Sequence, residues 1–531
     1  MSALPGHRLA LAVRVIIVWV MCLAWIIPSW GEGFSLKGQN EARYRRGYLS
    51  GRATGASIGS FENSLDLTAS YNRIRLYLRQ RYLLPSEFNV TQTGLAAFDK
   101  RYLEYRQDDW RLRGGSFYRI WGRGLLFGTA EKVEINYDNG LEGLLVEGGL
   151  KGWDGAAFKG VHTDADGVIR ENAEGARLSW RTPKLLDLRL GTSLVYMEES
   201  RLHPRLDRRG YEIEIRRDIA GLYLAYTNDK PGFSENLLPT TLQYPHGFYG
   251  AFTVGDLNWG LLVDYKNYRL LVEDPYADFP QPFLQYPPTA FPEATIALLD
   301  RQQRAFKTYA DEVGAQMELT ASAGDWSGRL NLTLGSEQNG DRMLPSIHAK
   351  SSRYRGIFVY AENYQSTGNR LVLRAAQLVD IQVVPPLTRE DTYWYKRNAG
   401  AAEYFLPLTE FLTLQAELEL LWFVLDQDIA GEKSTFNSYR DESLNLGLLR
   451  SPDFAFNAVI VRSGDRNETG GLQWNDRHRY WPSAELALNI GHGHQVRLFG
   501  GHEQGGVRCA GGLCRWVNPF RGAKISLTSQ F

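Results

Sequence analysis

The chain is poor in several features on which other classes of protein depend. Its 531 residues include only 3 cysteines and 5 methionines, and 60 basic side chains balance 60 acidic ones. A chain without net charge has no overall attraction for nucleic acid, so we expect no nucleic-acid partner. After the first thirty or so residues, no apolar run approaches the roughly 20 residues that a helix needs to cross a bilayer. If the chain lies in a membrane, it crosses as strands.

Recognisable catalytic and cofactor motifs are also missing. The sequence has no Gly-x-Ser-x-Gly elbow, phosphate-binding loop or dinucleotide fingerprint in a suitable setting, and no Cys-x-x-Cys-His. His492 and His494 flank Gly493, but no carboxylate or third ligand stands nearby, so no metal site is predicted. We therefore expect no enzymatic activity and no cofactor.

Residues 1–31 have the composition of a secretory signal peptide. A positive start at Arg8 and Arg14 precedes an almost wholly apolar run from Val15 to Ile27, and Ser29 and Gly31 are spaced for cleavage after Gly31. The alternative is an uncleaved anchor, although the apolar run is short for a spanning helix. We expect the mature chain, residues 32–531, to be secreted.

Cleavage would remove Cys22 and leave two cysteines, Cys509 and Cys514, separated by four residues. Outside the cytoplasm such a pair favours a structural disulfide that closes a small loop. Two sulfurs without a nearby His or carboxylate fall short of a tetrahedral metal site.

Much of the chain shows alternation of apolar and polar residues with period two. In the segment that starts at Phe411, one face would carry Leu412, Leu414, Ala416, Leu418, Leu420 and Trp422, and the other Thr413, Gln415, Glu417 and Glu419. A helix would mix these two sets around its circumference, whereas a strand separates them. The final segment repeats the pattern up to Phe531. A soluble sandwich also alternates, so this pattern alone does not choose between the two folds.

The connections between these segments favour a membrane barrel. Tight turns such as 255–258, 322–325 and 450–453 alternate with long polar links near 228–246, 273–307, 337–352 and 424–440. Short periplasmic turns and long extracellular loops are typical of bacterial outer-membrane barrels. We predict an all-β fold, a transmembrane antiparallel β-barrel of roughly 24 strands within a range of about 20 to 26, in the bacterial outer membrane.

Several sequence features also resemble a known group of proteins. The C-terminal Phe531, preceded by alternating apolar residues, resembles the signal by which the barrel-assembly machinery recognises outer-membrane proteins, although Ser529 departs from the usual bulky residue. The Tyr118-Arg-Ile-Trp-Gly-Arg-Gly-Leu125 segment, the long loop with Tyr286-Pro-Pro-Thr289 and Leu298-Leu-Asp-Arg-Gln302, and Cys-Ala-Gly-Gly-Leu-Cys resemble a broad family of uncharacterised, porin-like outer-membrane barrels. The resemblance implies a fold and a location, with outer-membrane lipid as a partner, and no catalytic residue.

Arginines are the candidate selectivity residues of the predicted lumen. Alternation places several of them on polar faces of the N-terminal third: Arg43, Arg45, Arg73, Arg75, Arg79, Arg81, Arg111 and Arg113. One hypothesis is a basic wall that favours anionic or polyhydroxylated solutes. The alternative is a lumen network in which inward acids such as Glu104, Glu212 and Glu214 neutralise these arginines.

Two segments are candidates for narrowing or covering the pore. Residues 120–140 have few turn residues at their start and could fold inward, with constriction candidates Trp121, Arg123, Glu131, Glu134 and Asp138. The alternative is an external loop or an extra strand pair. The proline-rich link 273–307 is predicted to be a long extracellular loop, either a lid or ligand contact or a shield over the barrel mouth.

These features predict a porin-like channel for small or elongated hydrophilic solutes. Two other functions are compatible with the same fold. One is a structural sleeve around a periplasmic protein partner such as an electron carrier, and the other is a barrel-embedded hydrolase of lipid or polysaccharide.

Overall fold

A computed structural model describes most of the chain after the first 32 residues. The described residues are 33–49, 56–84, 96–133, 137–163, 169–182, 187–199, 206–231, 245–270, 284–285, 287–288, 296–302, 311–338, 343–346, 352–384, 391–429, 432–465, 472–475, 478–491, 493–510 and 513–531. The predicted signal peptide, residues 1–31, and the constriction candidate Glu134 lie outside these ranges.

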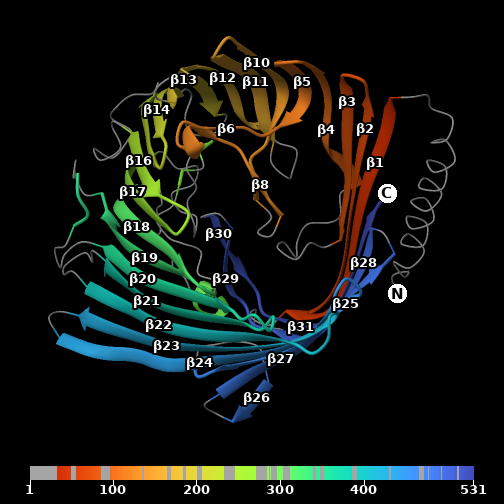
Figure 1. Cartoon of the computed structure of the whole chain (residues 1–531), viewed down its shortest axis with the longest axis vertical. Coiled ribbons are helices and arrows are strands. Elements are labelled where there is room, and N and C mark those ends of the chain that lie inside the picture. The colour runs from red at the N-terminus through yellow and green to blue at the C-terminus, as the bar shows by residue number, and fades with distance from the viewer. Residues whose placement is uncertain are drawn as a thin grey trace.

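The described residues form a closed antiparallel barrel of 24 strands, as the sequence predicts (Figure 1). The wall strands are β1 (Phe34–Leu49), β2 (Ala56–Tyr71), β3 (Ile74–Leu84), β4 (Ala96–Gln107), β5 (Trp110–Phe117), β10 (Leu141–Leu150), β11 (Trp153–Thr163), β12 (Ile169–Thr182), β13 (Asp187–Glu199), β14 (Leu206–Arg217), β15 (Ala220–Pro231), β16 (His246–Gly255), β17 (Trp259–Arg269), β18 (Asp311–Ala323), β19 (Trp326–Glu337), β20 (Arg353–Tyr364), β21 (Arg370–Val384), β22 (Asp391–Pro407), β23 (Leu412–Ile429), β24 (Glu432–Arg450), β25 (Phe454–Ser463), β27 (His478–Ile490), β28 (His494–Glu503) and β31 (Phe520–Gln530).

The ring closes between the first and last wall strands. β1 pairs with β31 from Gln39 opposite Gln530 to Leu49 opposite Phe520, and β31 pairs on its other side with β28. The terminal residue Phe531 exchanges two backbone hydrogen bonds with Gly38, of 2.7 and 3.0 Å. Closure leaves no unpaired strand edge, which is the condition for a sheet to cross a bilayer.

Short turns and long links alternate around the ring. Asn72, Asp108, Lys151 and Asp218 occupy two-residue turns with positive φ, all at the end of the barrel where β1 begins and β31 ends. Asn, Asp and Gly tolerate that conformation, which two-residue hairpins require. By the outer-membrane pattern this end is periplasmic and the long links are extracellular.

One of the expected long links is instead a hairpin of extended strands. The polar composition of 424–440 predicts a link, but β23 runs to Ile429 and β24 starts at Glu432. The ladder continues past a bulge at Leu425/Asp426. Polar side chains there reflect strands that continue beyond the apolar belt, because a strand outside lipid no longer needs an apolar face.

The outer face of the wall is apolar. Leu414, Leu418 and Trp422 of β23 are exposed, as are Leu444 and Leu446 of β24 and their counterparts on other strands. The inward face of the same strands carries the buried polar groups, such as Glu419 beside Leu421. So large an exposed apolar surface fits contact with lipid. The chain is therefore a protein of the bacterial outer membrane.

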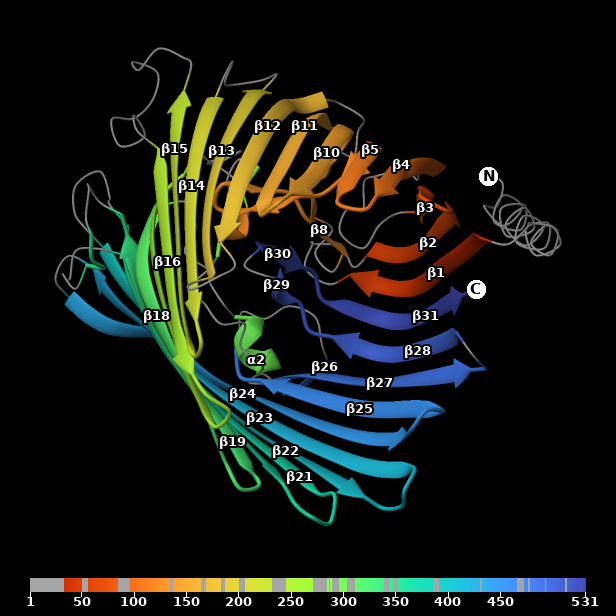
Figure 2. The same ribbon diagram turned by 45° about the horizontal axis from the view of Figure 1, so that its top comes forward.

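Several short elements lie off the wall. They are β6 (Ile120–Trp121), the 3-10 turn η2 (Gly122–Gly124), β7 (Phe127–Gly128), β8 (Glu131–Lys132), β9 (Tyr137–Asp138), α2 (Ala297–Asp300), β29 (Gly506–Ala510) and β30 (Leu513–Val517). A further short strand, β26 (Leu472–Asn475), pairs with β27 and extends the sheet at that point. β6, β8, β29 and β30 lie inside the ring in Figure 1, and α2 lies inside it in Figure 2. Among the residues the structure describes, no helix is long and apolar enough to span a membrane.

Candidate functional site

The lumen is the candidate site, and a large part of the described structure inside it comes from residues 118–140, here called the inner segment. β5 and β10 form a hairpin in which Phe117 lies opposite Leu141, and the inner segment is the connection between them. It does not continue the wall: its strands pair only with one another, β6 with β7 and β8 with β9. Its described elements lie inside the ring instead (Figure 1), and its role as a constriction stays a prediction.

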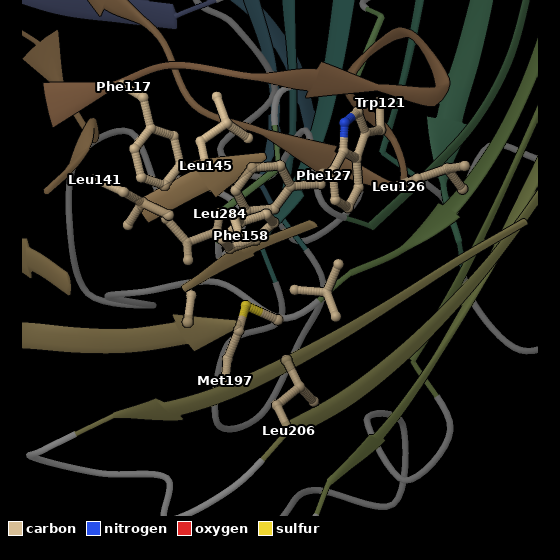
Figure 3. Packing of buried hydrophobic residues seen from close by; sticks show 12 residues of the cluster. Phe117, Trp121, Leu126, Phe127, Leu141, Leu145, Phe158, Met197, Leu206 and Leu284 are labelled. Atoms are coloured by element: carbon tan, nitrogen blue, oxygen red, sulfur yellow. The ribbon is translucent and has the colours of Figure 1, made fainter. Parts of the chain in front are cut away.

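An apolar cluster holds the first half of the inner segment against β10 to β14. Trp121, Leu126 and Phe127 are almost completely buried with Phe158 of β11 and Leu284 of the long link (Figure 3). The Phe127 and Phe158 rings stack with centroids 4.7 Å apart. Burial of this many large side chains stabilises the segment by several kcal/mol, at roughly 1.5 to 3 kcal/mol each.

Glycines in the wall provide the space for two leucines of the inner segment. A Cβ added to Gly210 of β14 would lie 2.6 Å from a methyl group of Leu126. One added to Gly247 of β16 would lie 2.7 Å from a methyl group of Leu125. Any larger residue at these positions would push the segment away from the wall.

A cation from the inner segment lies against aromatic rings of the wall nearby. The Arg123 guanidinium lies 4.1 Å from the ring centre of Tyr223 on β15 and 5.8 Å from that of Tyr249 on β16. Both tyrosines are buried and hydrogen-bond to wall carboxylates, Tyr223 to Glu212 and Tyr249 to Asp264. Arg123 is thus bound on the opposite side of the lumen from β3 and β4.

Ion pairs hold the other half of the inner segment to β3 and β4. Glu131 accepts hydrogen bonds from Arg79, at 2.7 and 2.9 Å, and from Arg81 at 3.2 Å. Lys100 of β4 lies 2.5 Å from Asp138. The segment is therefore attached to β3 and β4 at one end and to β14 to β16 at the other.

The long link 273–307 contributes a second structure to the lumen. Gly128 donates a backbone hydrogen bond of 3.0 Å to the Leu284 carbonyl, and the Gln285 amide donates one of 2.5 Å to the Leu125 carbonyl. Farther along, both carboxylate oxygens of Glu419 accept backbone N–H groups at the start of α2, from Ala297 and Leu298, each at 3.0 Å. Glu419 faces the lumen, so the described parts of this link, which joins the extracellular ends of β17 and β18, fold inward.

The hairpin of β29 and β30 completes the inner structure. Val507 donates a backbone hydrogen bond of 3.0 Å to the Arg301 carbonyl, and the Arg301 side chain donates one of 2.9 Å to Gln504. The backbone register places Cys509 directly opposite Cys514. Opposite Cα atoms in an antiparallel pair are about 4.5 to 5.5 Å apart, within disulfide range, and the disulfide stays a prediction.

Most of the predicted lumen arginines are paired with acids. Arg79 contacts Asp99 as well as Glu131, and Arg81 shares both partners. Arg111 pairs with Glu147, and Arg113 pairs with Glu104 while lying 4.0 Å from the Tyr102 ring centre. These contacts follow the neutralised network that the sequence analysis kept as its alternative.

The remaining arginines lie at different positions. Arg43 pairs with Glu41 at 2.6 Å, and the buried Arg45 donates a hydrogen bond of 3.1 Å to Ser60. Arg75 is exposed near the periplasmic end of β3. Arg73 was expected on the same strand face, but it lies in the turn before β3 begins at Ile74, so it is not part of the wall.

Sequence reasoning missed several groups that build the site. Glu147, which also accepts hydrogen bonds of 2.6 and 2.7 Å from Arg119, was not singled out, and neither were the wall glycines. Glu419 was placed on the inward face of its strand, but its contact with α2 was not foreseen. Alternation along its strand could have placed Glu147 on the inward face. No sequence pattern near a wall glycine indicates that a distant leucine packs against it. In the described part of the chain, no group of three or more His, Cys, Asp or Glu is placed to hold a metal ion.

A polar cavity of about 470 Å³ lies at the periplasmic end of the lumen beside the inner segment. Its charged lining includes Arg106, Arg111, Arg119 and Arg177, together with Asp108, Asp109, Glu147 and Asp154. Trp121 of the inner segment borders it. A solute that crosses the barrel would meet both signs of charge here.

Comparison with known proteins finds similarity in architecture alone. No protein-family model and no curated protein matches the chain. Solved structures that match include the P pilus usher (PapC) translocation pore, with 10% identity over 93% of this chain and 99% of that one, at a TM-score of 0.43. OccK5 (OpdH) of Pseudomonas aeruginosa matches with 11% identity over 74% and 98%, at 0.38. The siderophore receptor PirA of the same organism matches with 9% identity over 93% and 80%, at 0.42. At these scores the similarity carries no argument about function.

Proposed function

We propose that the protein is an outer-membrane channel through which small or elongated hydrophilic solutes diffuse. The observation that supports this proposal is the combination of a polar inner wall with an inner segment that crosses the lumen and is held by side-chain contacts. A segment that only completed the wall would instead form a strand hydrogen-bonded to the neighbouring wall strands. A segment bound in this way narrows the water-filled path and sets the size of the solute that passes.

The proposed channel has weak charge selectivity. An anion preference is the expectation from the arginines alone, but Arg79, Arg81, Arg111 and Arg113 each lie against a carboxylate. Paired charges of opposite sign partly cancel in the potential that a passing ion meets. We expect a small reversal potential with the sign of anion preference in a salt gradient, and a cation-selective sign would contradict this part of the proposal.

Conductance in planar bilayers tests the channel and the role of the inner segment together. Because Phe117 and Leu141 are direct partners, residues 118–140 can be replaced by an Asn-Gly turn that keeps the β5 and β10 register. We expect single-channel conductance to rise several-fold in this variant, since the proposed constriction would be gone. Heat-dependent migration in SDS gels shows whether the variant still folds as a barrel.

The possible outcomes separate the two parts of the proposal. Equal conductance of the folded variant and the natural chain would show that the inner segment does not limit the pore. No conductance from either would contradict the channel itself and favour the sleeve around a periplasmic partner, which co-purification in detergent would then have to show.

A further inference from the structure

A basic groove lies on the outer face of the barrel, at the extracellular ends of β19 to β24. Its volume is about 780 Å³, and its lining includes Arg353, Arg355, Trp394, Lys396, Asp426 and Lys433. We refer to it as the outer groove. It plays no part in the proposed channel, because its basic side chains face away from the lumen.

The strand register shows that the outer groove faces outward. Leu334 lies opposite Arg355, Arg355 opposite Val379, and Val379 opposite Lys396. Directly paired residues of an antiparallel sheet lie on the same face. Leu334 belongs to the exposed apolar belt, whereas the alternate residue Tyr354 is buried and hydrogen-bonds to Glu312.

The groove begins where the lipid-facing belt ends. Ile357 and Val359 follow Arg355 on the same face of β20 and are 45% and 42% exposed. Arg353 starts this strand directly after the long link that ends at 352, so the basic residues occupy its extracellular end. A molecule in the groove would therefore lie at headgroup level, with apolar wall directly below it.

Cations outnumber carboxylates in the described lining of the groove. Four cations lie there with one carboxylate, Asp426, which is 2.6 Å from Lys396. The Lys433 ammonium lies 5.8 Å from the centre of the Trp394 ring. Ser434 and Thr435 add neutral hydroxyl groups. Arginine pairs and hydroxyl donors of this kind suit a phosphate oxygen, because guanidinium groups match its geometry.

We infer that the outer groove binds the phosphorylated headgroup of an outer-leaflet glycolipid. The acyl chains would lie along Ile357 and Val359, and the phosphate would contact Arg353, Arg355 and Lys433. A lipid fits both observations, the positive groove and the apolar face below it, whereas a free anion would use only the first. The lipid fixes the barrel at a defined depth in the outer leaflet.

The test compares the natural chain with a triple variant, Arg353→Gln, Arg355→Gln and Lys433→Gln, in detergent. Lipid A with two phosphates is titrated, and bound lipid is measured by native mass spectrometry and by the rise in Tm. Each basic side chain near an anionic lipid surface strengthens binding by about fivefold, so the triple variant should bind on the order of a hundredfold more weakly. A matched control, Arg216→Gln with Arg217→Gln, removes exposed arginines at the periplasmic end and should bind as the natural chain does.

The remaining arms identify the ligand. Dephosphorylated lipid A should bind weakly to every variant, and inorganic phosphate alone should not raise the Tm. Equal binding of lipid A to the natural chain and to the folded triple variant would overturn the inference. A Tm rise with inorganic phosphate that the triple variant loses would assign the groove to free anions and would also overturn it. Conductance is not used here, so a failure would not bear on the proposed channel.

Discussion

At the scale of single residues, the lumen depends on small side chains as much as on charged ones. Gly210 and Gly247 have no side chain of their own to place in the lumen, yet each is the position where a leucine of the inner segment meets the wall. The ion pairs of Glu131 and Asp138 then hold the opposite end. Shape at one end and charge at the other together determine where the segment lies.

Substitution of Gly247 by Val should loosen the inner segment without breaking the barrel. The added methyl groups would overlap Leu125, and overpacking of this kind costs about 1 to 3 kcal/mol. We expect a higher and noisier single-channel conductance, measured in planar bilayers. Gly59→Val is the control, because a Cβ at Gly59 meets nothing within 4 Å. Unchanged conductance in the folded Gly247→Val variant would contradict the packing described here.

At the scale of elements, connections and not strands fill the lumen. The described parts of the 273–307 link contact the inner segment, the hairpin of β29 and β30, and Glu419 of the wall. α2 has only four residues and no side-chain cap of its own. Glu419 of the wall accepts hydrogen bonds from its first backbone N–H groups. This short helix therefore depends on a contact with a residue distant in the sequence.

Removal of this carboxylate should release α2 from the wall. In Glu419→Ala the N–H groups of Ala297 and Leu298 lose their acceptor, and loss of a helix cap costs about 1 kcal/mol. Arg301 should then be cut about fivefold faster by trypsin added to intact cells, the factor that corresponds to about 1 kcal/mol. The control Glu410→Ala, in a periplasmic turn, should leave the cleavage rate unchanged. Equal rates in the two variants would show that Glu419 does not hold α2.

At the scale of the whole molecule, the membrane determines which faces are apolar. The exposed leucines of the outer belt would be unfavourable in water and are favourable against lipid. The same fold can therefore place arginines and glutamates at its centre, where a soluble protein would have its core. Among the described residues, three apolar clusters lie inside the ring. Two of them contain a leucine of the inner segment, Leu126 in one and Leu125 in the other, and the third contains Leu298 and Leu299 of α2.

An arginine placed in the belt should test this orientation directly. Leu418 is 47% exposed on the lipid-facing side of β23, so Leu418→Arg should lower the free energy of unfolding in lipid vesicles by about 2 to 4 kcal/mol. Leu257 is fully exposed in a periplasmic turn, so Leu257→Arg should change the free energy of unfolding by less than about 0.5 kcal/mol. Urea titration of both variants provides the measurement. A small effect at Leu418 would mean that this face does not contact lipid.

The sequence by itself determined the barrel, its even strand number, its orientation and its membrane. The alternation of apolar and polar residues and the spacing of the turns are local properties, so both can be read from short stretches of the sequence. The inward acids Glu104 and Glu212 could be named from the same alternation, and the ion pairs with Arg113 and Arg177 follow from that shared face.

Only the tertiary structure decided how the lumen is filled. Leu125 and Gly247, or Glu419 and Ala297, are separated by more than a hundred residues, and no local pattern links them. The same holds for the outer groove, whose four cations come from β20, β22 and β24 and face one space only because the closed sheet places these strands near one another. These contacts form only when the ring closes and brings distant segments together. Alternation along one strand does not indicate which distant residues that strand will contact.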